Sequence, residues 1–132
     1  MSTFEGALRT RLVTYPAAAA EAGDRVSWVM RPQQDPLPAF VMQLISAPVG
    51  QTMDGFETAR RARVQVDAWS RSHAQAVRMR DAAIAALIPA AEAGGIRFQR
   101  AFVSVREGGE PTDEGFAFRQ LMDFLFTYSE AA

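Results

Sequence analysis

The chain of 132 residues contains no cysteine. This absence excludes disulfide bonds, thiolate metal sites and cysteine nucleophiles. The one histidine, His73, cannot supply a histidine metal cluster, and no HExxH or GxSxG motif accompanies it. Gly108-Gly109 lies among acidic residues that would repel phosphate. We therefore expect neither a cofactor nor a metal, and an enzyme is the least supported class of function.

The chain also lacks strong net charge and long apolar runs. A net charge of −1 does not indicate a dedicated nucleic-acid binder. The longest apolar runs, Ala17–Ala20 and Ala82–Ile88, are too short to cross a bilayer, and residues 1–5 do not resemble a signal peptide. With 48% apolar residues, we expect a soluble single domain over residues 1–132 that has no membrane partner.

The most informative segment that is present is Phe116–Tyr128. Aromatic residues and Met122 occupy alternate positions there, interrupted by Gln120, which is typical of a half-buried strand. Straight, it would span about 43 Å, against a diameter of about 36 Å for a compact chain of this length. The strand must therefore bend at a bulge, or one end must leave the globule and reach a neighbouring copy, and we predict an assembling subunit. An aromatic lining for a small apolar ligand is the alternative interpretation of this stripe.

The remaining pattern predicts an α+β fold with an antiparallel or mixed β-sheet and helices packed on one face. Phe4, Leu8 and Leu12 form an apolar stripe, with Arg9 and Arg11 off it. Helices are expected at Thr3–Val13, at Ala17–Ala22 and from the cap Ser72 to about Leu87. The other expected strands are Arg25–Met30, Ala39–Ala47 (central, because both its faces are apolar), Arg60–Ser70 and Ile96–Arg106, with loops at Arg31–Pro38, Pro48–Phe56 and Glu107–Gly115.

Charged and aromatic residues outside the expected core suggest contacts between subunits. Loop carboxylates are usually solvated, but a carboxylate pair for acid–base chemistry could lie among Asp54, Glu57, Asp67, Glu107, Glu110, Asp113 and Glu114. His73, in the first turn of a helix, is expected at the surface or in a cap. The basic cluster of Arg60, Arg61 and Arg63 either protects a strand edge or contacts a partner.

A basic cluster and an acidic loop could form the two unlike surfaces of a ring interface. Trp69 shares a strand face with Arg63 and Asp67, which makes it an interface candidate. The loops at Pro48–Phe56 and Glu107–Gly115 are expected to contact a tube or the adjacent subunit. The candidate subunit or tube interface comprises Asp54, Phe56, Arg60, Arg61, Arg63, Trp69, Glu107, Glu110, Asp113 and Glu114.

Taken in order, short motifs over residues 4–128 resemble a known family. The most specific is Arg63–Trp69, which reads Arg-Val-Gln-Val-Asp-Ala-Trp and follows a Met53-Asp54-Gly55 turn. The others are Ala7-Leu8-Arg9, Gly23-Asp24-Arg25-Val26, Leu37–Val41, Gln43–Ser46, Ala74 with Ala76, and Arg119–Phe124. The chain resembles the tail-completion or tail-terminator family of long-tailed bacteriophages, prophages and phage-like gene transfer particles. It departs from the family at Ser27-Trp28 and Ala39-Phe40.

The resemblance implies a structural virion protein with no catalytic residues. Such a protein caps the tail tube as a ring, usually a hexamer, stops tube polymerisation and provides the docking surface for the head–tail connector. Its implied partners are copies of itself, the major tail tube protein and the connector or stopper protein, while DNA passes through the lumen without specific binding. The implied location is the head-proximal end of the tail, after assembly in the host cytoplasm. A head–tail stopper and a small ligand-binding module remain alternatives.

Overall fold

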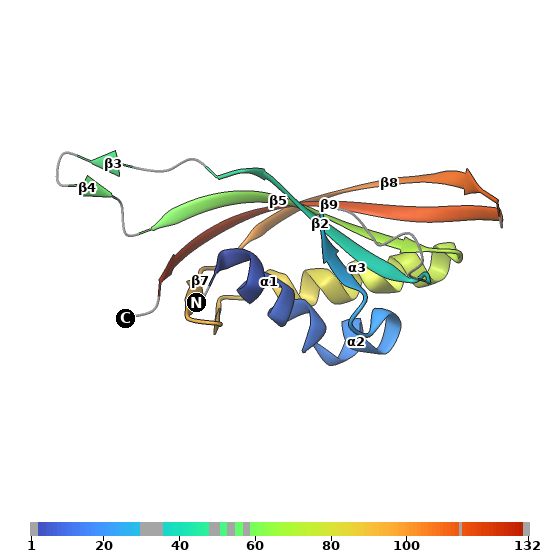
Figure 1. Cartoon of the computed structure of the whole chain (residues 1–132), viewed down its shortest axis with the longest axis horizontal. Helices are drawn as coiled ribbons and strands as arrows, with labels where there is room; N and C mark the ends of the chain where they lie inside the picture. Colours follow the sequence, from blue (N-terminus) through green and yellow to red (C-terminus); the bar gives the residue numbers. More distant parts are fainter. Residues whose placement is uncertain are drawn as a thin grey trace.

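A mixed seven-stranded sheet carries all three described helices on one of its faces (Figure 1). The computed structural model describes residues 3–29, 36–47, 51–52, 55–56, 59–113 and 115–130. The α+β class predicted from the sequence is confirmed.

The helices form where the sequence predicts them. Helix α1 covers Phe4–Val13, α2 covers Pro16–Ala22 and α3 covers His73–Leu87. Thr3 Oγ1 accepts a hydrogen bond from the Gly6 amide, and Ser72 Oγ accepts one from the Gln75 amide. These hydroxyls satisfy amides that have no partner within their own helices, so each cap defines a start.

The sheet has the order β1-β2-β5-β9-β7-β6, and β8 also pairs with β9. The strands are β1 Val26–Trp28, β2 Ala39–Ser46, β5 Arg60–Ser70, β6 Ala91–Ala93, β7 Ile96–Phe98, β8 Phe102–Thr112 and β9 Gly115–Glu130. A separate hairpin pairs β3 Gln51–Thr52 with β4 Gly55–Phe56, inside the segment expected to be a loop.

The expected antiparallel pairing of consecutive strands is wrong for β1 and β2, which are parallel. A parallel pair needs a connection that carries the chain back to its starting end. Strand β1 is only three residues long, roughly 10 Å, so residues 29–38 are enough to cover that distance.

Two further predictions about the C-terminal half are wrong. Ile96–Arg106 is two strands, β7 and β8, with Gln99–Ala101 between them. Glu107–Gly115 is mainly strand: β8 continues to Thr112 and pairs with β9 as far as Gly115. The segment is polar because both its faces are largely exposed, and its backbone hydrogen bonds to β9 do not require apolar side chains.

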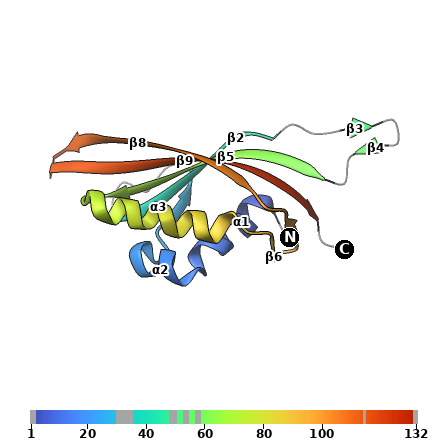
Figure 2. The same cartoon turned by 180° about the vertical axis from the view of Figure 1, so that it is seen from behind.

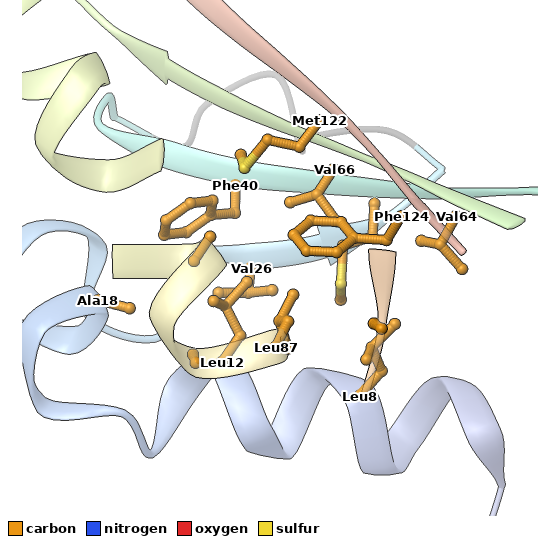
Figure 3. Packing of buried hydrophobic residues seen from close by; sticks show 14 of the residues in the cluster. Leu8, Leu12, Ala18, Val26, Phe40, Val64, Val66, Leu87, Met122 and Phe124 are labelled. Carbon is orange, nitrogen blue, oxygen red and sulfur yellow. The ribbon is translucent and has the colours of Figure 1, made fainter. Parts of the chain in front are cut away.

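The core lies between the helices and the helix-covered face of the sheet (Figure 3). Phe40, Met42, Val64, Val66, Met122 and Phe124 pack there against Leu8, Leu12 and Leu87. Strand β2 is interior, as expected, but only its first half is covered, since Leu44 and Ile45 are exposed. Arg11, expected off the apolar stripe, is only 7% exposed. It donates to the Ala86 and Pro89 carbonyls at 2.9 and 2.7 Å, near the end of α3.

Strand β9 is the axis of the sheet. Its sixteen residues would span about 53 Å if straight. They pair with β5 on one side. On the other side, residues 115–125 pair with β8 and residues 128–130 pair with β7. No bulge interrupts the long ladders with β5 and β8. The strand curves, and the end of the β8–β9 hairpin extends past the start of α3 (Figures 1 and 2). The strand therefore curves without the expected bulge in its long ladders, and its hairpin end extends beyond the helices, whereas contact of that end with a neighbouring copy stays a prediction.

Candidate assembly surfaces

One face of the sheet has no helix over it (Figures 1 and 2). Because side chains alternate along a strand, β5 directs Val64, Val66 and Ala68 into the core and the intervening residues to the opposite side. The residues of β9 that pair with these positions of β5, and the residues of β8 that pair with them in turn, lie on the same side. We call this side the helix-free face, and its members include Arg61, Arg63, Gln65, Asp67, Trp69, Phe102, Ser104, Arg106, Glu110, Arg119, Leu121, Asp123 and Leu125.

One part of the helix-free face is a polar cluster around Asp67. Arg119 donates to Asp67 Oδ2 through Nε at 3.1 Å and Nη2 at 2.7 Å, and Gln65 Nε2 donates to Oδ1 at 3.1 Å. The Arg119 guanidinium lies over the Trp69 ring, 5.1 Å from its centroid. Asp67 is 7% exposed, so this charge is largely removed from water and compensated within the chain. Trp69 shares this face with Arg63 and Asp67, as the alternation in the sequence predicts.

A groove crosses the same face further along the strands. Arg63, Leu125 and Phe102 are register partners on β5, β9 and β8, so they form one row across three strands. Ser104 and Asp123, the next register pair two residues along β8 and β9, also line the groove. Phe102 is 72% exposed and Leu125 is 45% exposed. An apolar pair thus lies in the open beside an arginine.

The third surface is the hairpin arm, which consists of β8 together with residues 115–125 of β9. Every residue of β8 except Val103 is exposed. Among the described residues, β9 is the one strand that pairs with β8, which leaves eleven residues with an open edge. Such edges are templates for contact with another chain unless they are protected, and Arg106, Glu107 and Pro111 interrupt this one.

A row of four polar side chains attaches the arm to α3. Arg80 Nη1 donates to Gln120 Oε1 at 3.1 Å, and Gln120 Nε2 donates to Glu107 Oε2 at 2.6 Å. The same oxygen accepts from His73 Nε2 at 2.7 Å. The hydrogen bonds from His73 and then Gln120 lower the pKa of Glu107. His73 is at the surface, as expected, but nothing in its sequence context indicated Glu107 as its partner.

No three histidine or acidic side chains among the described residues gather as a metal site. None of the helices in the described part of the chain has the length and apolar character needed to span a bilayer. Within the aromatic stripe of β9, Phe124 and Phe126 are packed in the core with Phe98, whereas Phe116 is 45% exposed.

Comparison with protein families decides the class of the protein. Residues 6–123 match the family described as tail completion protein gp17. The chain belongs to this family. As a member of the tail completion family, it is a structural protein of a phage-type tail. No curated protein matches the sequence.

Solved structures support the fold of this tail completion protein. A chain of the virion of a native gene transfer agent particle superposes with a TM-score of 0.67 at 16% identity, covering 96% of this chain and 94% of its own. A second solved chain, without a descriptive name, gives a TM-score of 0.57 at 14% identity, covering 97% and 93%. Both share the architecture over nearly the full length.

In this tail completion protein, the interface residues predicted from the sequence lie at different places on the sheet. Arg60, Arg61 and Arg63 are exposed at the start of β5, whereas Glu110 and Asp113 are at the tip of the hairpin arm. Glu110 is eight residues along β8 from Phe102 in the row of Arg63, or roughly 26 Å. The basic and acidic groups therefore do not meet within one chain. Asp54 and Glu114 lie outside the described residues, and Phe56 is placed only as a backbone position of β4.

Proposed function

We propose that this tail completion protein is a tail terminator. Copies form a ring, with six as the expected number, on the head-proximal end of the tail tube. The ring stops tube polymerisation and presents the surface on which the head–tail connector docks. DNA passes through its lumen without specific contacts, and assembly takes place in the host cytoplasm.

The main support for a ring is that one chain has two oppositely charged surfaces at separate places. A closed ring of identical subunits needs two different patches that complement each other. The arginines at the start of β5 and the carboxylates at the tip of the hairpin arm are opposite in charge. They are too far apart to neutralise each other within the chain. Contact between neighbours brings them together and sets the register of the ring.

The family and the solved structures support the same proposal. The family's description names tail completion, which is the step that a terminator performs. The gene transfer agent virion contains a chain of the same fold, which agrees with a place in an assembled particle. Phe124 and Phe126 of the aromatic stripe are used for core packing, which disfavours a ligand-binding module.

Removal of the chain from a producing strain tests the proposal. Without a terminator, tails polymerise beyond their normal length and do not join heads, and adding the purified chain back restores both. Electron microscopy of the particles measures both properties, and light scattering follows the mass of the chain alone and with tube protein. Tails of normal length that still lack heads would instead indicate a stopper acting after termination. Normal, infectious particles would refute both functions.

A further inference from the structure

The groove on the helix-free face contains an exposed apolar pair beside a cation. Phe102 and Leu125 face each other across β8 and β9, and Arg63 continues their row on β5. Their exposed fractions, 72% and 45%, leave a continuous apolar surface in water. Exposed apolar patches that are rimmed by polar groups commonly mark contact sites.

The charges around the groove favour an acidic partner. Arg61 and Arg63 lie on the same face in β5, and Arg106 lies on it in β8. Asp123 is the one acidic residue of the described lining, and it faces Arg106 at 3.9 Å. The groove therefore combines an apolar floor with a basic rim.

The tip of the hairpin arm has the opposite chemistry. Phe116 is 45% exposed, and its ring lies across Gly109 and against Phe118, with ring centroids 5.0 Å apart. Asp113 is exposed in the turn at the same tip, whereas Glu110, the register partner of Ala117, lies on the opposite face of the hairpin from Phe116. An exposed aromatic ring next to an acidic turn complements an apolar floor beside arginines, and a guanidinium can also stack on the ring.

The arm cannot reach the groove of its own chain. Pro111, the register partner of Phe116, is nine residues from Phe102 along β8, or roughly 30 Å. A continuous ladder between β8 and β9 holds these positions apart. The occupant of the groove is therefore a different molecule.

We propose that the groove of each subunit binds Phe116 from the hairpin arm of the next copy. The inference rests on the proposed ring and specifies how neighbouring subunits contact each other. The ring of Phe116 covers Phe102 and Leu125, while Asp113 in the turn of the arm meets Arg61 and Arg63. Because donor tip and acceptor groove are different surfaces, each copy uses both and the contact propagates around the ring.

The absence of native cysteine permits a direct test in purified particles. A chain carrying both Ser104→Cys and Pro111→Cys places one thiol in the groove and one beside Phe116. Within one chain these positions are roughly 23 Å apart, well beyond the reach of a disulfide. After mild oxidation we expect a non-reducing gel to show dimers, trimers and larger species up to the closed ring. The single-cysteine variants should remain monomeric.

A photoreactive side chain identifies the occupant independently. With p-benzoylphenylalanine in place of Phe102, irradiated particles should yield an adduct with the tryptic segment 107–119 of the same protein, which contains the tip. An adduct with the tube protein, with a connector protein or with another segment would overturn the inference. Dimers formed by either single-cysteine variant would overturn it as well, because they indicate a symmetric contact.

A substitution measures the contribution of the anchor. Phe116→Ala should lower the yield of rings at least about tenfold while the thermal unfolding of the free chain stays close to wild type. Leu44→Ala is the comparison, because Leu44 is similarly exposed, at 40%, and lies on β2 outside the contact. Rings in normal yield from Phe116→Ala would refute the anchor, whereas absence of the wild-type chain from the tail end would refute the proposed function itself.

Discussion

His73 Nε2 donates a hydrogen bond to Glu107 Oε2 over 2.7 Å, which joins the first turn of α3 to the middle of β8. The carboxylate also accepts from the buried Gln120 of β9, whose own side chain accepts a hydrogen bond from Arg80 of α3. The arm is therefore attached to the helix at two points, through His73 and Glu107 and through Arg80 and Gln120.

The stability of the protein should fall in acid partly through Glu107. Its pKa is lowered in the folded state, so its contribution is complete above the unfolded pKa of about 4.3 and is lost as pH falls through the folded pKa. Glu107→Gln should remove this component. Urea unfolding between pH 3 and pH 7 should show wild type and variant converging at low pH. A constant difference across that range would contradict the assignment.

Replacement of Gln120 by leucine should lower the free energy of unfolding by about 1–3 kcal/mol. The buried amide satisfies Arg80 and Glu107, and a leucine would leave both without it. Gln43→Leu is the matched control, because Gln43 is an exposed strand residue and its replacement should change stability by less than about 0.5 kcal/mol. Equal effects of the two changes in urea unfolding would show that the row of polar side chains contributes nothing.

Arg11→Met should destabilise the chain by about 3 kcal/mol. The guanidinium is buried, which lowers its pKa, and it satisfies two carbonyls near the end of α3 while lying 4.7 Å from the centroid of Phe98. Arg97→Met removes an exposed arginine and should cost less than about 1 kcal/mol. Thermal and chemical unfolding provide the comparison, and a stable Arg11→Met protein would argue against this role.

Alanine at Gly109 should disturb the tip of the arm. A Cβ there would lie 2.5 Å from Phe116 Cε2 and 2.8 Å from the Ala117 carbonyl oxygen, so the ring and the backbone would both have to move. The expected loss is about 1–3 kcal/mol, together with faster amide exchange in residues 107–119. The neighbouring Gly108→Ala is the control, since its Cβ would make an ordinary 3.5 Å contact with Leu121. Identical exchange in the two variants would contradict the steric argument.

Reversal of the charges at Arg61 and Arg63 should weaken ring formation by more than about tenfold. Both side chains are exposed and lie on the proposed acceptor side, so folding should be unaffected. The control is Arg78→Glu, which changes the net charge per site equally at an exposed position on α3, on the other side of the sheet. Light scattering in the presence of tube protein measures the assembly. Combining the reversal with Asp113→Arg should restore part of it.

Much of the candidate site was predictable, because its residues follow the period of their own strand. The bounds of β5 agree with the prediction, and its alternation places Arg63, Asp67 and Trp69 on one face without any tertiary information. The groove was not predictable. Phe102 and Leu125 are far apart in the chain, and only the register of β8 against β9 makes them neighbours of Arg63. The partners of Glu107 were missed for the same reason.

Local chemistry by itself determined α1 to α3 with their caps and the long strand β9, because hydrogen-bonding hydroxyls, proline and period-two aromatic residues act within a few residues of where they stand. Tertiary structure alone decided the parallel pairing of β1, the strand character of Glu107–Thr112 and the burial of Arg11. Each of these depends on backbone or side-chain partners supplied by distant segments. A polar segment such as Glu107–Thr112 becomes a strand because it pairs with the free edge of β9. Its composition alone does not predict this pairing.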